Sequence, residues 1–142
     1  MKNVKGQSLF EVLLALFIIT LIIVAVVVLS TISISNSLFS KNKTLASKYT
    51  QEAIEWLRSE KESDINLFLG NTTGTYCLED LNFNNSGVCG ELEIIPNTVF
   101  TRQMVFTNDL SGVISVIVTT SWTDSKGIHE VSTSTDFTDR RD

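Results

Sequence analysis

The chain has 142 residues, a formal net charge of -5 and 43% hydrophobic residues, many of them gathered near the N-terminus. The acidic balance argues against a nucleic-acid partner, because binding phosphates requires clustered lysines and arginines. The residues beyond the N-terminal apolar segment are enough for one small domain with a modest core.

A long apolar run dominates the N-terminal part. Two lysines precede Gly6, and the run from Leu9 to Leu29 is interrupted only by Glu11 and one threonine. The part that follows Glu11, Val12–Leu29, has about 18 residues, near the lower limit for a membrane-spanning helix. The positive-inside tendency places residues 1–6 in the cytoplasm and the chain after about Ser30 outside.

Two simpler interpretations of this run remain open. An ordinary secretory signal would be cleaved after small residues, and a weak site of this kind occurs at Ser33–Ser35. A plain membrane anchor explains the apolar run, but it does not explain Glu11. A carboxylate at the edge of a bilayer-length apolar helix is costly, so its presence requires a reason.

The helical pattern continues beyond the apolar run. The strongest helix breakers, Gly and Pro, are absent between Gly6 and Gly70, although the segment Ser30–Lys43 is rich in poor helix formers. We predict one helix from about Ser8 to Ser59 or Ser63, amphipathic in its second half. The residues expected on its apolar stripe repeat every three to four positions: Leu45, Tyr49, Ala53, Trp56 and Leu57.

The segment Asp64–Asn97 has a loop composition, with short strands predicted at Thr75–Leu78 and Glu91–Ile95. It contains both cysteines of the chain, Cys77 and Cys89. Their even number, close spacing and expected location outside the cytoplasm favour a disulfide over free thiols or a zinc site.

The C-terminal part predicts strands at Thr98–Thr107, Val113–Thr123 and Ile128–Phe137. The short connections force antiparallel pairing. The predicted fold class is therefore α+β, with a long N-terminal helix whose amphipathic second half packs on a small antiparallel sheet. The residues expected on one face of the middle strand are Ile114, Val116, Val118 and Trp122.

The N-terminal motif resembles a known processing signal. Gly6 followed by Ser8-Leu9-Phe10-Glu11 and the apolar run is similar to the class III signal of type IV pilins and pseudopilins. The stretch from Ser8 to Phe17 is most similar to the minor-pilin and minor-pseudopilin branches. The predicted order of leader, long helix, loop and antiparallel sheet also resembles that family.

The resemblance implies roles for three residues. Gly6 would be the last residue of the leader and Gln7 the first mature residue, cut and methylated by a prepilin peptidase. Gln7 departs from the phenylalanine that many family members have there. Glu11 falls on the family's acidic position, where it would pair with the new amine of its own or a neighbouring subunit. The implied organisation is leader 1–6, assembly helix 7–29, amphipathic helix half 30–63 and extracytoplasmic β-rich domain 64–142.

The expected function is that of a structural subunit, a minor pilin of a type IV pilus-like surface filament. The alternatives are a pseudopilin of a type II secretion-like system and a membrane-anchored extracellular binding module. The expected partners are other pilin subunits, a prepilin peptidase and, before assembly, the inner membrane. No enzyme activity, cofactor or metal is expected, because the only histidine, His129, lies in a predicted strand as an exposed residue without a catalytic or ligand set around it.

Overall fold

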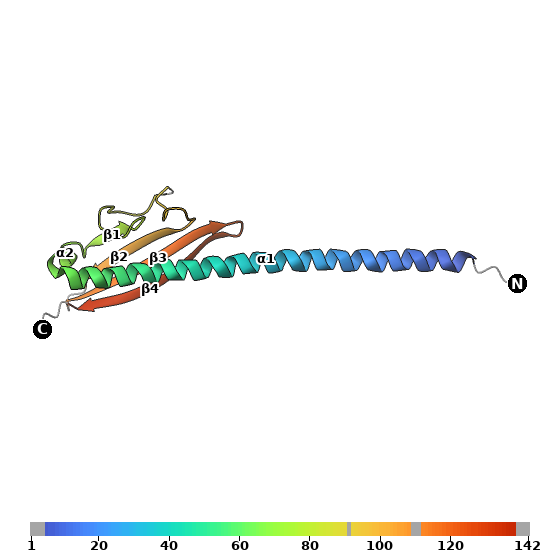
Figure 1. Ribbon diagram of the computed structural model, residues 1–142, viewed down its shortest axis with the longest axis horizontal. Helices are drawn as coiled ribbons and strands as arrows, with labels where there is room; N and C mark the ends of the chain where they lie inside the picture. Colours follow the sequence, from blue (N-terminus) through green and yellow to red (C-terminus); the bar gives the residue numbers. More distant parts are fainter. Residues whose placement is uncertain (1–4, 91, 109–111, 139–142) are drawn as a thin grey trace. The chain divides into compact units, whose positions relative to one another are not determined.

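The computed structural model describes residues 5–90, 92–108 and 112–138. Its elements confirm the α+β fold class (Figure 1). Helix α1 (Lys5–Ser63) is followed by a short helix α2 (Ile65–Gly70) and by strands β1 (Gly74–Cys77), β2 (Thr101–Asn108), β3 (Val113–Asp124) and β4 (Gly127–Thr138). The chain divides into two compact units at Ser40 and Lys41, so α1 contributes to both.

The first unit is the helical segment up to Ser40. The poor helix formers around Ser30 are helical in the structure, and their hydroxyls bond within the helix. Ser30 donates to the carbonyl of Val26 at 2.8 Å, and Thr31 donates to that of Val27 at 3.0 Å. Back-bonding of this kind satisfies the hydroxyls inside the helix, which allows polar side chains to lie next to an apolar segment.

In the second unit, α1 from Lys41 onwards packs on one face of the sheet (Figure 1). Of the predicted stripe, Ala53 and Leu57 are buried, whereas Leu45, Tyr49 and Trp56 are only half-buried. Trp56 still packs against the core from the side of the stripe. The buried face of the helix combines small side chains with two larger ones, and the other large apolar side chains lie at its flanks. Small residues allow a helix to approach a sheet closely. The buried residues of this face are Ala46, Thr50, Ala53, Ile54 and Leu57.

The sheet is antiparallel with strand order β1-β2-β3-β4. In β3 every second side chain is buried, which confirms the predicted face and extends it to Thr120. The Thr120 hydroxyl lies 2.8 Å from that of Thr50, so the helix and sheet share a polar contact inside the core. The sheet begins later in β2 than predicted, at Thr101, because residues 95–98 form a turn with Asn97 at a φ of 60°.

The segment between α1 and β2 differs most from the prediction. The segment contains helix α2, which was not predicted. The carboxylate of Asp64 caps the N-terminus of α2 by accepting hydrogen bonds from the backbone amides of Asn66 and Leu67, each at 3.0 Å. Phe68 of α2 is 1% exposed and forms edge contacts with Phe106 and Phe137. The strand predicted at 91–95 is absent from residues 92–95, and Glu91 lies outside the described residues. Instead, residues 85–87 lie along the free edge of β1, through a bridge between Tyr76 and Ser86.

Candidate functional site

The first candidate site is the apolar surface of α1 between Leu9 and Leu29. Every large apolar side chain in this range is between 48% and 70% exposed. The most apolar 18-residue window of the helix has a mean hydropathy of 3.5, and none of it is buried. Its only hydroxyl, that of Thr20, donates to the carbonyl of Phe17 at 2.8 Å. The helix is thus long and apolar enough to serve as a membrane anchor or a signal sequence.

Glu11 is the one charged residue between positions 9 and 40 of the sequence, and its side chain is exposed on the helix surface. Gly6 and Gln7 lie in the first turns of α1, but their side chains are outside the described part of the structure, as is the whole of residues 1–4. A lone carboxylate on an otherwise apolar helix requires a cation or a polar headgroup beside it once the surface is taken out of water.

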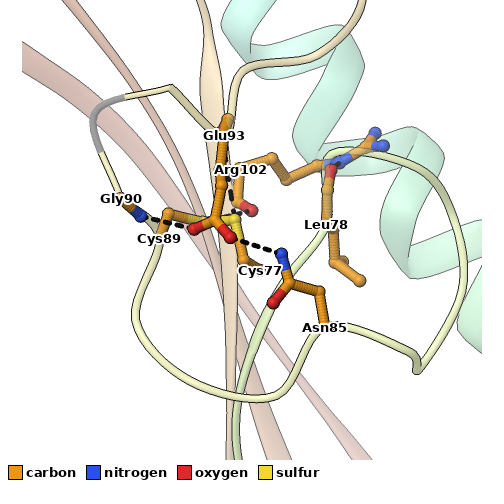
Figure 2. The surroundings of a disulfide bond; sticks show 7 residues. All are labelled: Cys77, Leu78, Asn85, Cys89, Gly90, Glu93 and Arg102. Carbon is orange, nitrogen blue, oxygen red and sulfur yellow. Dashed lines mark hydrogen bonds between the residues drawn. A yellow bond between two sulfur atoms is a disulfide. The ribbon is translucent and has the colours of Figure 1, made fainter.

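The second candidate site is the disulfide loop of the second unit. Cys77, the last residue of β1, forms the predicted disulfide with Cys89, and their Cα atoms are 4.9 Å apart (Figure 2). The sulfur of Cys89 lies 3.3 Å from the carbonyl oxygen of Arg102, so the loop is held against β2. The disulfide therefore connects an irregular segment to the sheet.

Glu93 organises the same loop, although the sequence analysis did not single it out. Figure 2 shows its carboxylate between Asn85 and Gly90. One oxygen accepts from the side-chain amide of Asn85 at 2.6 Å, and the other accepts from the backbone amide of Gly90. These bonds, the one from Asn85 first, lower the pKa of the Glu93 carboxyl below its ordinary value of 4.5.

Cys77, Cys89 and Glu93 place three potential ligand atoms within 4.8 Å of one another. Both sulfurs belong to the disulfide, so neither offers the thiolate that a metal would bind. Both Glu93 oxygens also accept hydrogen bonds. With the disulfide formed, these three residues hold the loop in place through the disulfide and the two hydrogen bonds.

Arg102 is the residue that connects the loop, the sheet and the helix. Its side chain, on the inner face of β2, is 3% exposed. The guanidinium group lies beside Leu78 (Figure 2) and donates to its carbonyl at 3.2 Å. It also donates to the carbonyl of Tyr49 in α1 at 3.1 Å and lies 3.2 Å from the Glu52 carboxylate. Burial lowers the pKa of the Arg102 guanidinium, and the charge of Glu52 opposes that shift.

His129 differs from the expectation of an exposed residue. Its side chain is 23% exposed, its Nε2 atom lies 2.9 Å from the carboxylate of Asp124, and its ring lies 5.2 Å from that of Trp122. The two-residue turn between β3 and β4 brings Asp124 and His129 to the same end of the hairpin. The backbone amide of Lys126 and the His129 side chain, in that order, lower the pKa of the Asp124 carboxyl.

Comparison with known protein families, with curated proteins and with solved structures finds no match to this chain. The assignment therefore depends on the architecture. A long apolar N-terminal helix whose C-terminal part packs on a four-stranded antiparallel sheet, together with a disulfide, is consistent with a pilin-like fold.

Proposed function

We propose that this protein is a minor pilin, a structural subunit of a type IV pilus-like surface filament. The observation that carries the proposal is the lone Glu11 carboxylate on the apolar part of a helix that continues into a pilin-like domain. Before assembly, residues 9–29 anchor the chain in the inner membrane, and the disulfide-bonded domain lies outside the cytoplasm.

Processing supplies the partner of Glu11. A prepilin peptidase cuts after Gly6 and methylates the new amine of Gln7. That amine is a cation in apolar surroundings, and Glu11 offers the opposite charge one helical turn away. The amine pairs with its own Glu11 or with that of a neighbouring subunit.

The charge pair acts mainly on the register of the subunits. Apolar surfaces between helices are non-directional, so many registers bury similar areas. A wrong register leaves an unpaired buried charge, which costs several kcal/mol. Other pilin subunits are therefore the principal partners, and they bind through residues 7–29.

The alternative assignment is a pseudopilin of a type II secretion-like system, which would share the processed apolar N-terminal helix and the role of Glu11. A membrane-anchored extracellular binding module is the second alternative, and it would retain residues 1–6. Catalysis is not part of the proposed function.

The first experiment is an intact mass of the protein purified from membranes, with Gly6→Val as the comparison. We expect wild type to lack residues 1–6, with the mass of one added methyl group if Gln7 is methylated, and Gly6→Val to remain uncut. A wild-type N-terminus at Met1 or near Asn36 would reject prepilin processing.

The second experiment measures incorporation. Glu11→Ala should insert in the membrane and be processed normally, yet be depleted from sheared surface filaments relative to its amount in membranes. Glu55→Ala, on the exposed face of α1 in the second unit, is the matched control and should incorporate like wild type. Equal incorporation of Glu11→Ala would contradict the pairing role. Absence of wild-type chain from surface filaments, with normal processing, would favour the pseudopilin.

A further inference from the structure

A groove of about 380 Å³ lies on the second unit, where the last turns of α1 meet α2 and the loop at residues 81–84. Its volume is within the range of small-ligand sites. Two aromatic rings, two leucines, three asparagines and one glutamate line it: Trp56, Glu60, Leu67, Asn71, Leu81, Asn82, Phe83 and Asn84.

The aromatic wall of the groove is rigid. The rings of Trp56 and Phe83 are in contact, with centroids 4.8 Å apart. The ring of Phe83 also packs against two buried core rings. Its centroid lies 5.5 Å from that of Tyr76 and 6.4 Å from that of Phe106. Trp56 and Phe83 are themselves only half-buried, so parts of both rings remain accessible. The wall is therefore formed before any ligand arrives, which reduces the entropic cost of binding.

The polar side of the groove consists of amides held by local hydrogen bonds. The Asn71 amide nitrogen donates to the carbonyl of Leu67 at 2.9 Å, which leaves its side-chain oxygen as an acceptor. The Asn82 side-chain oxygen accepts from the backbone amide of Asn84 at 2.9 Å, which leaves its NH₂ group as a donor. Donors and acceptors thus lie beside an apolar wall.

We propose that this groove binds a neutral carbohydrate. A sugar ring presents apolar C–H groups on one face and hydroxyls around its edge, which matches an aromatic wall flanked by amides. Glu60 is the only charged lining residue, so acidic sugars are disfavoured. A quaternary ammonium ligand would need rings on several sides of the cation, whereas Trp56 and Phe83 touch and form one wall.

This site does not depend on the proposed function. It is built entirely within the second unit, and an anchored binding module or a filament subunit could use it equally. Its ligand would be met outside the cytoplasm, where the disulfide also places the domain.

The test is saturation-transfer-difference NMR on the full chain, solubilised in an uncharged polyoxyethylene ether detergent, because detergents with sugar or alkylammonium headgroups would compete with the probes. The probes are glucose, galactose and N-acetylglucosamine, with glucuronate and tetramethylammonium as the acidic and cationic comparisons. We expect signals from at least one neutral sugar at about millimolar affinity, as a small ligand with few contacts implies, and none from the two comparisons.

Two groove variants and one control locate the binding. Trp56→Ala should abolish the sugar signal. Trp56 also packs against the core, so a second variant with little risk to folding is needed. Asn84→Ala removes the exposed side-chain amide of another lining residue, which offers the ligand a donor and an acceptor. It should weaken binding about fivefold, the loss of one neutral hydrogen bond. Arg58→Ala, exposed on the same helix but outside this groove, should bind like wild type. The proposal is overturned if wild type binds none of the neutral sugars, if tetramethylammonium binds in their place, or if both groove variants retain wild-type affinity.

Discussion

Replacing Arg102 by alanine tests whether one buried guanidinium holds the disulfide loop, β2 and α1 together. The change removes two hydrogen bonds to backbone carbonyls, those of Leu78 and Tyr49, and leaves a cavity at a site that is 3% exposed. Hydrogen bonds from a charged donor contribute about 1.5–3 kcal/mol each. The cost of burying the guanidinium, visible in its lowered pKa, offsets part of this. We expect Arg102→Ala to lower the free energy of unfolding by about 2–4 kcal/mol.

The ion pair with Glu52 should contribute much less. Half of the Glu52 side chain is exposed, so solvent screens its charge, and Glu52→Gln should cost less than about 1 kcal/mol. Arg102→Met retains most of the side-chain volume, so the difference between Met and Ala measures the packing component.

The assay is urea unfolding of the fragment 41–142, followed by near-UV circular dichroism. The fragment is a compact unit and should fold alone. A loss below 1 kcal/mol for Arg102→Ala would refute the role of the guanidinium. An equal loss for Glu52→Gln would show that the ion pair, and not the carbonyl contacts, carries the stabilisation.

Three further predictions concern the same fragment. Leu57→Ala, at a side chain with no exposed surface, should cost about 2–5 kcal/mol in urea unfolding, whereas half-buried Trp56→Ala should cost only about 2 kcal/mol, roughly half of the value for a buried tryptophan; the reverse order would show that Trp56 is more deeply buried than Leu57. Removing the disulfide with Cys77→Ser and Cys89→Ser should cost about 3 kcal/mol for a loop of this length, and an unchanged urea midpoint would contradict its stabilising role. The pKa of the Glu93 carboxyl is lower in the folded than in the unfolded chain, so its contribution is present above about pH 4.5 and is lost as the pH falls through the folded pKa. The protection factor of the Gly90 amide, which corrects for the intrinsic slowing of exchange in acid, should therefore fall in acid in wild type, and Glu93→Gln should remove most of that fall.

The long helix and the strands were predictable because their sequence signals are strong and local. The absence of Gly and Pro between Gly6 and Gly70 predicts the long helix, and the alternation from Ile114 to Trp122 predicts the buried face of β3. Arg102 could also have been placed from the sequence, because it alternates with Met104 and Phe106 and therefore lies on the inner face of its strand.

The disulfide loop was less predictable because its structure depends on contacts between residues that lie apart in the chain. Glu93 accepts from Asn85 and Gly90, and Asn85 in turn accepts from the backbone amide of Cys77. None of these hydrogen bonds produces a periodic pattern of residues in the sequence. The predicted strand is absent from residues 92–95 for this reason: Ile94 and Ile95 favour a strand, but the hydrogen bond from the Glu93 amide to the Gly90 carbonyl turns the backbone away from a ladder. Helix α2 was missed because six residues and a single cap give too weak a pattern.

The change in side-chain size along α1 explains why one helix can have two kinds of surface. Up to Leu29 the helix is apolar all round, and its large side chains are exposed, as suits contact with lipid or with other helices. From Ala46 onwards the buried line contains two alanines and a threonine, and apolar bulk is confined to Ile54 and Leu57. An all-round apolar surface gives no preferred direction for packing, whereas a narrow line of small residues selects one face of a sheet. Glu11 is the only charged residue between positions 9 and 40 of the sequence, and in the filament that we propose it would supply the direction that the apolar surface lacks.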